Sequence, residues 1–304
     1  MATKIAAIPV LKPTAAEMER HHFGDTEWKP IYSGISSFFH INRIEDYRKY
    51  LRLPLPPHRK TVYDFIFLTQ GNSLRSKGLD EYMMTQNSFF FLPPFQITNH
   101  KSMSDDARGF YCHFDAEILL KYYKHDQLLA EFPFLQFIGH PIIQLEQSAV
   151  ESVVHILNRL KNEYDLKRDR FDIISVYMMA LLVEVKQYYG NVIKTGENAA
   201  FRVTKQYKEA LMQYVYEKQK IMQYADMLAV TPNHLNKCVK AVTGKSAHDL
   251  LDEMILLEAK ALLRQTNFPI SDIAFKVGKE FLSDFVRFFK GKTGLTPTEY
   301  RQMD

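Results

Sequence analysis

The chain has 304 residues, 46% of them hydrophobic and 13% aromatic, which is enough apolar material for two cores, so two folded domains are expected. The longest uncharged apolar run, residues 173–183, is too short to cross a bilayer, and the first residues lack the features of a signal peptide, so a cytoplasmic location and no membrane partner are predicted. Cys112 and Cys238 lack the spacing of a disulfide framework or a zinc site, and both are predicted to be buried thiols.

The net positive charge lies in the last third of the chain. Residues 201–304 carry 16 Lys and Arg against 12 Asp and Glu, whereas residues 1–200 carry 23 of each. This asymmetry indicates a polyanionic partner for the C-terminal segment.

Between about residues 30 and 115 short apolar runs alternate with turn residues. The runs read GISSFFHI, TVYDFIFLTQGNS, DEYMMTQNS, FFFLPP and RGFYCHFD. Their spacing and aromatic content predict an all-β unit of short strands, either a barrel or a sandwich. Residues 63–68 alternate between two largely apolar faces, so this strand is expected to be covered on both sides. Asn72 and Asn87 are expected in turns because Asn tolerates positive φ.

From residue 115 onward the apolar period becomes helical. Residues 146–164 place their apolar side chains on one stripe, which is typical of a helix that packs one face. Residues 171–189 are apolar nearly all round, so this helix is either buried within its own domain or forms part of a dimer seam. Residues 190–200, with two Gly and little periodicity, are predicted to be a linker.

A short helix, a turn and a basic second helix are predicted from residue 221. Thr231 is expected as the N-cap of the second helix, with Pro232 in its first turn. Its outward residues share one polar face and are Asn233, Asn236, Lys237 and Lys240. Asn can pair with adenine and Lys with guanine or phosphate, so this face suits the major groove of DNA.

The pattern recurs about fifty residues later, and both copies close on Lys-x-x-Thr-Gly, at residues 240–244 and 290–294. Two such units can place two recognition helices in successive major grooves, about 34 Å apart, if the predicted helix over residues 250–263 sets their spacing.

Residues 220–302 resemble the AraC/XylS family of bacterial transcription regulators. The resemblance rests on YADMLAVTPNHLNKCVKAVTGKS, on LLEAKALLRQTNFPISDIAFKVG and on FVRFFKGKTGLTPTEYR. It implies base-facing positions at Asn233, Asn236 and Lys237 in the first unit. In the second unit the implied positions are Leu282, Ser283, Val286 and Arg287.

The second unit departs from the family pattern at Lys279, Phe281 and Asp284. Leu282 and Val286 can contact a thymine methyl group but cannot hydrogen-bond a base. The first recognition helix is therefore expected to dominate sequence choice. The second is expected to hold the DNA backbone through three cations, Lys279, Lys290 and Lys292.

The resemblance also implies a cupin-like sensing domain before the DNA-binding module. A metal-dependent cupin needs two closely spaced His ligands, but Lys60 occupies the second position after His58, and His100 and His113 are expected to be structural. No metal, cofactor or catalytic residue is therefore predicted, and the sequence does not identify ligand-binding residues.

The predicted fold class is α+β: a cupin-like β-barrel or sandwich with a helical connector, then an all-α tandem helix-turn-helix module. The predicted domains are a sensing domain (1–145), a connector with possible dimerisation helices (146–189), a linker (190–200) and a DNA-binding domain (201–304). The predicted function is a non-enzymatic, sequence-specific transcription regulator whose DNA binding a small effector modulates. The alternatives are a metal-dependent cupin enzyme and an interaction module that docks on an acidic partner.

The expected partners are double-stranded DNA, a small-molecule effector, RNA polymerase and a second copy of the chain in a homodimer. Activator is the expected role, although the sequence leaves the choice between activation and repression open.

Overall fold

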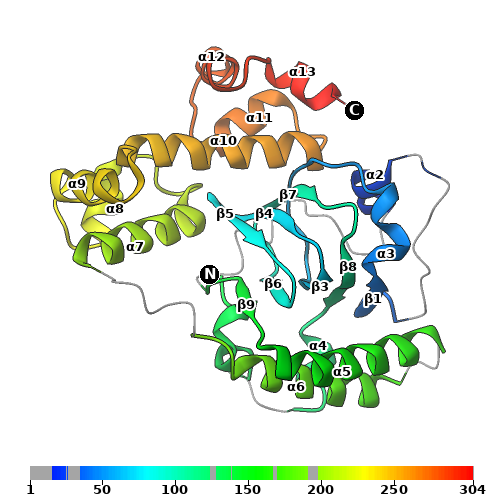
Figure 1. Cartoon of the computed structure of the whole chain (residues 1–304). Helices are drawn as coiled ribbons and strands as arrows, with labels where there is room; N and C mark the ends of the chain where they lie inside the picture. Colours follow the sequence, from blue (N-terminus) through cyan, green and yellow to red (C-terminus); the bar gives the residue numbers. More distant parts are fainter. Residues whose placement is uncertain are drawn as a thin grey trace. The chain divides into compact units, whose positions relative to one another are not determined.

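A computed structural model of the chain describes residues 16–24, 26, 35–123, 128–137, 139–166, 170–190 and 198–303. The chain divides into two compact units, formed almost entirely by residues before and after position 193 (Figure 1). Part of the predicted linker, residues 191–197, lies outside the described residues. Within the described part of the chain, no helix has the length and apolar character needed to span a membrane.

The first unit is a β-sandwich of two sheets rather than a closed barrel. Its five-stranded sheet has the order β1 (Phe39–Arg43), β8 (Arg108–Phe114), β3 (Tyr63–Gln70), β6 (Ser88–Leu92) and β9 (Ile142–Gln144). Its four-stranded sheet has the order β2 (Leu55–His58), β7 (Thr98–Met103), β4 (Ser73–Lys77) and β5 (Asp80–Met84). Two short helices, α2 (Ala16–Phe23) and α3 (Ile44–Tyr47), accompany the strands.

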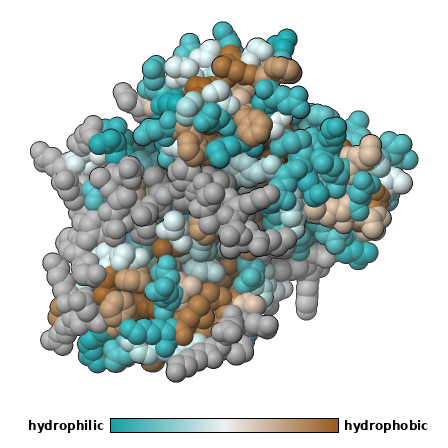
Figure 2. All heavy atoms as spheres, turned by 180° about the vertical axis from the view of Figure 1, so that it is seen from behind, coloured by the Kyte–Doolittle hydropathy of each residue, from teal (hydrophilic) through white to brown (hydrophobic). Residues whose placement is uncertain are grey.

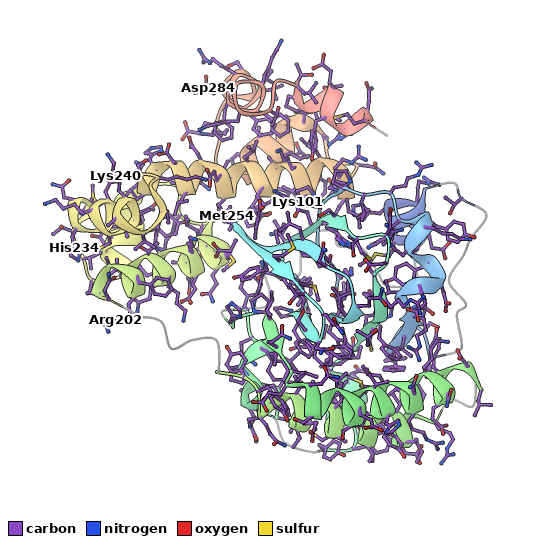
Figure 3. The ribbon with its side chains drawn as sticks, viewed as in Figure 1. Lys101, Arg202, His234, Lys240, Met254 and Asp284 are labelled. Carbon is purple, nitrogen blue, oxygen red and sulfur yellow. The ribbon has the colours of Figure 1, made fainter. Side chains whose placement is uncertain are left out.

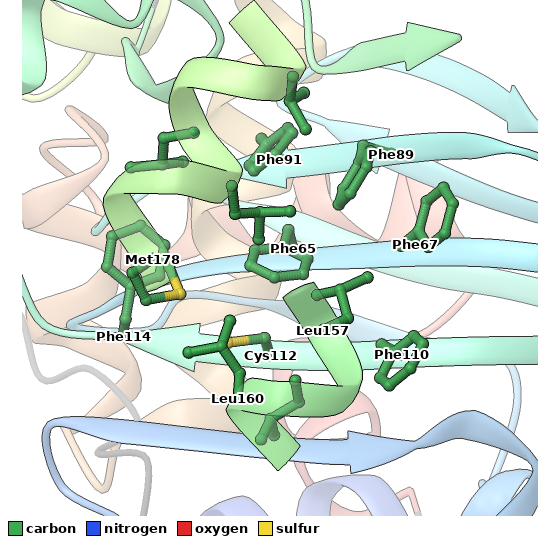
Figure 4. Close-up of a cluster of buried hydrophobic side chains, with 14 of the residues drawn as sticks. Phe65, Phe67, Phe89, Phe91, Phe110, Cys112, Phe114, Leu157, Leu160 and Met178 are labelled. Atoms are coloured by element: carbon green, nitrogen blue, oxygen red, sulfur yellow. The ribbon is translucent and has the colours of Figure 1, made fainter. Parts of the chain in front are cut away.

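The central strand β3 is covered on both faces, as its sequence predicts. On one face Phe65 and Phe67 pack with aromatic residues of β6 and β8 beneath Leu157 and Met178 of the helices (Figure 4). On the other face Ile66 and Leu68 pack with Met84 of β5, which belongs to the second sheet. The unit therefore has three layers: helices, the five-stranded sheet and the four-stranded sheet.

Several strands were not predicted, because their sequences do not read as strands. Strand β4 has the sequence SLRSK, yet Arg75, Ser76 and Lys77 in it are buried. Strand β2 contains two prolines and lies at the edge of its sheet, which is the position where a missing backbone donor is tolerated. Asn87 has the predicted positive φ, of 63°, whereas at the preceding turn Gly71 has it instead of Asn72.

The helices predicted as a connector belong to the first unit. Helix α5 (Gln147–Asp165) and helix α6 (Phe171–Lys186) lie against the five-stranded sheet and contribute to its core. The reason is that their buried stripes cover the phenylalanine face of the sheet, which would otherwise be exposed to water. Helix α6 is buried on one side only, because Val176 and Val183 are 55% and 49% exposed.

The second unit is all α-helical. The first three helices are α7 (Ala199–Tyr214), α8 (Ile221–Met227) and α9 (Pro232–Thr243), and α7 packs against α9. Helix α10 (Ala247–Gln265) contacts both these helices and the last group, which comprises α11 (Ile270–Lys276), α12 (Leu282–Thr293) and α13 (Pro297–Gln302). Cys112 and Cys238 are both buried free thiols, as predicted.

A buried histidine predicts how the stability of the first unit depends on pH. Burial lowers the pKa of His113 from 6.5 to about 4, opposed by its hydrogen bond to the Ser36 carbonyl oxygen. Between these values the unfolded state binds more protons, so the free energy of unfolding should fall as the pH decreases, by about 2 kcal/mol at pH 5 for this residue. Urea unfolding at pH 7.5 and pH 5 measures the change.

The variant His113→Gln keeps a donor for the Ser36 carbonyl but does not titrate in this range. It should lose less stability between the two pH values than the wild type does. An equal loss in both proteins would show that His113 does not contribute.

Candidate nucleic-acid interface

The first helix-turn-helix is closed by backbone hydrogen bonds and a helix cap. The amide of Val230 donates to the Ala225 carbonyl at 3.0 Å, and Ala229 between them has a left-handed φ of 54°. This pairing ends α8 and turns the chain sharply. The Thr231 hydroxyl then accepts from the His234 amide at 3.2 Å, with Pro232 at the first position of α9. The predicted cap therefore starts the recognition helix where the sequence places it.

Helix α9 has one buried face and one exposed face. Leu235, Cys238 and Val239 are buried. The opposite face is exposed and carries the residues predicted from the sequence, Asn233, Asn236, Lys237 and Lys240. Neither Lys237 nor Lys240 forms an ion pair with any residue that the structure describes, and both side chains are exposed. These two cations are available to an external anion.

Asn236 has a second role that the sequence does not reveal. Its side-chain Oδ1 accepts a hydrogen bond from the Ala247 amide at 3.0 Å, at the first position of α10. That amide is one of the helix N-terminal donors that have no partner within the helix. Asn236 therefore joins α9 to α10, and its Nδ2 donors remain for a base or a phosphate.

The second helix-turn-helix lacks both the donor and the acceptor of this bond. Its closing sequence aligns residue for residue, so Val286 corresponds to Asn236 and Pro297 to Ala247. Proline has no amide hydrogen, so no acceptor is needed, and valine offers none. The acceptor is therefore present in the repeat that has the amide donor and absent in the repeat that lacks it, which supports a structural role for the Asn236 bond.

The second helix-turn-helix repeats the first turn with one more residue. The Lys279 amide donates to the Ala274 carbonyl at 2.9 Å, and Gly278 takes the left-handed conformation with a φ of 79°. Five residues separate α11 from α12, whereas four separate α8 from α9. Phe281 occupies the N-cap position of α12 and provides no side-chain cap.

The exposed face of α12 is less suited to base reading than predicted. Arg287 is the one charged residue among the base-facing positions predicted for this helix. Its Nη2 lies 2.5 Å from Oδ1 of Asp284, with which it forms an ion pair. Leu282 and Phe281 are 46% and 65% exposed, and hydrophobic side chains lie among hydrophilic ones at the α12–α13 end of the molecule (Figure 2). A carboxylate on this face repels phosphate, so Arg287 must first leave Asp284 to contact DNA.

The other predicted residues of α12 are placed as follows. Ser283 and Lys290 are exposed, and Val286 is half-buried between them and the buried Phe285. Lys290 has no ion pair among the described residues, whereas Lys292 pairs with Asp252 of α10 at 3.3 Å. Lys279 lies over the Phe288 ring at 4.4 Å. Of the three predicted backbone cations, Lys290 is therefore the one without a competing contact.

The structure adds His234 to the candidates. It is exposed in the first turn of α9, between Asn233 and Lys237, and its Nε2 lies 3.5 Å from the Cys238 sulfur (Figure 3). The sequence could have indicated this residue, because His234 lies three positions before Lys237 and so falls on the same face of the helix.

Tyr300 and Arg301, near the end of the chain, stabilise the second helix-turn-helix. Tyr300 packs edge-on against Phe289 with ring centroids 5.4 Å apart. The Arg301 guanidinium donates to the Phe268 carbonyl at 2.6 Å. These residues stabilise the unit and are separate from the exposed face of α12.

The histidines that a metal site would need have other partners. His100 Nε2 lies 2.8 Å from the Ser73 hydroxyl, and His113 Nε2 lies 2.9 Å from the Ser36 carbonyl. Among the described residues, no group of three or more His, Cys, Asp and Glu is arranged to hold a metal ion.

A family model described as a helix-turn-helix domain matches residues 224–303. Over 87 residues the chain is 36% identical to the bifunctional transcriptional activator/DNA repair enzyme AdaA of Bacillus subtilis, covering 29% of this chain and 41% of AdaA. Over 256 residues it is 23% identical to the HTH-type transcriptional regulator YisR of the same organism, covering 80% of this chain and 86% of YisR.

The chain is also 38% identical over 68 residues to the HTH-type transcriptional activator RhaR of Yersinia pestis, covering 22% of this chain and 23% of RhaR. The matched residues 224–303 are therefore a helix-turn-helix domain of the AraC type. DNA binding by the C-terminal unit follows from this domain. The match covers less than half of AdaA and lies in the helix-turn-helix region.

Two solved structures resemble this chain. One is the C-terminal domain of AraT, a response regulator from Geobacillus stearothermophilus, with 25% identity and a TM-score of 0.33 over 34% of this chain and 88% of that one. The other is unsaturated fatty acid-bound ToxT from Vibrio cholerae, with 14% identity and a TM-score of 0.36 over 88% of this chain and 95% of that one.

The bond between Asn236 and Ala247 predicts a coupled effect on stability. Replacing Asn236 by Val leaves the Ala247 amide without its partner and should lower the free energy of unfolding by about 1 kcal/mol. Replacing Ala247 by Pro removes that donor at a position where proline is well tolerated. The double variant has the residues that the second helix-turn-helix carries at these positions, and it should recover most of the lost free energy of unfolding.

Chemical denaturation of the wild type, both single variants and the double variant gives the coupling free energy. Additive losses would show that the two residues do not interact in solution.

Proposed function

We propose that the exposed face of α9 enters the major groove of DNA and reads the sequence there. The observation that carries this proposal is the set of polar groups on one side of α9, with Lys237 and Lys240 without ion-pair partners in the described chain. Asn233 lies in the first turn of the helix and Lys237 in the second, and the N-terminal part is the one that contacts base edges in helix-turn-helix proteins. Asn236, with its oxygen engaged, would contribute its amide donors.

In this proposal α12 holds the DNA more than it reads it. The ion pair between Arg287 and Asp284 and the exposed Leu282 support this division. The connecting helix α10 has 19 residues and is therefore roughly 28 Å long at 1.5 Å per residue. That length is of the order of one helical turn of DNA, about 34 Å, so both recognition helices could engage one duplex.

The remaining parts of the proposal concern the first unit and the partners. A small effector would bind in the β-sandwich, where a cavity is lined by residues of several strands and of α2. The protein would act in the cytoplasm as a homodimer, and an activating role would require contact with RNA polymerase. Exposed Phe275 and Phe281 in the second unit support a protein contact there.

DNA fragments selected from a random pool by the purified chain test the function. A regulator of this type should enrich a defined sequence and bind it much more tightly than a scrambled one at the same salt concentration. Equal binding to both, or tight binding to an acidic polypeptide instead, would favour a general interaction module.

Lys240 should contact phosphate. Because each neutralised phosphate releases condensed counterions, Lys240→Ala should reduce the slope of log K against log salt concentration by about one, with little change in base preference. Fluorescence anisotropy of labelled DNA at several salt concentrations measures the slope.

The matched control is Lys245→Ala, because Lys245 lies one turn further along the chain but already pairs with Glu253 at 2.6 Å. Its slope should stay close to that of the wild type. A Lys240 variant with an unchanged slope would remove this residue from the phosphate contacts.

The exposed side of α6 should form the dimer. Val176 and Val183 lie on one stripe of this helix and are 55% and 49% exposed, and burying them would remove apolar surface from water. Replacing both by Glu should convert the dimer to a monomer in sedimentation velocity. Leu166→Glu, a charge placed on an exposed apolar residue just beyond α5, serves as the control and should leave the dimer intact. An unchanged sedimentation coefficient in the double variant would place the interface elsewhere.

A further inference from the structure

A cavity of about 60 Å³ lies inside the β-sandwich. This is several times the roughly 10–15 Å³ that one water needs on this measure. Much of its wall is apolar, formed by Met18, Phe23, Tyr47, Leu51, Leu55 and Ile66. The rest of the wall is polar and unusually rich in nitrogen groups, among them Lys60, Arg75 and four histidines.

Arg75 is the unsatisfied group of this wall. It extends from β4, is 3% exposed, and faces His100 across the ladder between β4 and β7. Its Nε is buried without a hydrogen-bond partner. Among the residues that the structure describes, none forms an ion pair or a hydrogen bond with its guanidinium, whose carbon lies 5.4 Å from the centroid of the Phe90 ring.

A buried arginine in this state is costly. Its charge has left water, and no carboxylate replaces the lost hydration. Arginine stays protonated in proteins, so it cannot relieve the cost by losing its proton. The guanidinium therefore offers a planar set of donors, directed at a cavity, to any anion that enters.

The other charges of the wall do not balance Arg75. Lys60 pairs with Asp64 at 2.8 Å, and both side chains are almost fully buried, so the one buried carboxylate nearby is already taken. Glu19 of α2 lines the cavity and is partly exposed, but it forms no ion pair among the described residues. Two buried cations thus share one buried carboxylate.

The histidines do not add further charge. Burial lowers the pKa of His22, His40, His100 and His113 below its ordinary value, so all four are neutral at neutral pH. A neutral imidazole can still donate one hydrogen bond. In His22, His40 and His113 that donor is already used, on the Met18 carbonyl, the Tyr164 hydroxyl and the Ser36 carbonyl. Among its buried groups the cavity wall therefore carries one excess positive charge, to which the histidines add none.

We propose that this cavity binds a small organic carboxylate, with the carboxylate on Arg75 and the apolar body against Tyr47, Leu55 and Ile66. The proposal rests on the effector function proposed above and names the chemical class of that effector. A planar carboxylate matches the guanidinium fork in a bidentate pair. The apolar wall favours an acid with a hydrocarbon body over inorganic sulfate or phosphate, which would leave that wall without contacts.

One hydrogen-bond path joins the cavity to the helical layer. His40 lines the cavity, and its Nδ1 lies 2.5 Å from the hydroxyl of Tyr164, near the end of α5. The same hydroxyl lies 2.6 Å from the Ser36 Oγ. A ligand that shifts His40 would therefore act on the helices that carry the proposed dimer stripe.

Isothermal titration of the full chain tests the site without DNA. The probes are propanoate, butyrate and benzoate, each beside its uncharged amide of the same shape, together with sulfate and phosphate. At least one carboxylate should bind at least tenfold more tightly than its amide and than either inorganic anion. Amides that bind as well as the acids, inorganic anions that bind as tightly, or no binding by any probe would overturn the proposal.

Two substitutions locate the contact. Arg75→Met should weaken binding of the carboxylate at least tenfold, and Arg75→Lys should retain part of the affinity because the charge remains but the fork is lost. The matched control is Lys77→Met, which removes a buried cation two residues along β4 that donates to the carbonyls of Gln136 and Gly139 and does not line the cavity. Its affinity for the acid should match the wild type, and an equal loss in both Met variants would overturn the assignment.

A separate measurement keeps this proposal distinct from the regulatory one. DNA affinity is measured by anisotropy with and without the bound acid. Carboxylate binding that depends on Arg75 supports the site whatever the DNA result. A DNA affinity unchanged by the acid would count against the effector function alone, and a chain that binds no defined DNA would count against the regulator's proposed mode of reading.

Discussion

Each recognition helix depends on burying one face so that the other is held out to solvent. In α9 the buried face is formed around Leu235 and Val239, and in α12 around Phe285 and Phe289. Burying one such side chain contributes about 1.5–3 kcal/mol, which is more than a surface contact can supply. The orientation of the exposed residues is therefore set by the core behind them, and charged groups on the exposed face can differ between the two helices without disturbing the fold.

The two helix-turn-helix repeats carry different groups on their exposed faces. On α9, Lys237 and Lys240 have no ion-pair partners in the described chain, and Asn236 joins the helix to α10. On α12 the corresponding stability comes from Phe285 and Phe289, and the charge of Arg287 is cancelled by Asp284. The first helix-turn-helix thus has two exposed lysines without ion-pair partners in the described chain, although the same turn and the same closing motif build both repeats.

Local signals made the second unit predictable, while long-range contacts limited the prediction of the first. The start of α9 follows from Thr231 and Pro232, whose preferences act within one turn. By contrast, β4 could not be recognised, because Arg75 is buried by strands distant in sequence and its segment reads as polar. The same limit applies to the helices assigned to a connector: their apolar stripes were visible, but the sheet that they cover was not. Asn236 was predicted as a base contact, and its partner on α10 could be found only from the coordinates.

The extra residue between α11 and α12 makes the tandem repeat inexact in space as well as in sequence. The extra residue lies before the N-cap, because from N-cap to closing Gly the two helices align over residues 231–244 and 281–294. Leu282 and Ser283 follow the uncapped Phe281 in α12, whereas Pro232 and Asn233 follow the capping Thr231 in α9. The two helix-turn-helix repeats therefore present different side chains, and a DNA site that bound both would consist of two different half-sites rather than a direct repeat.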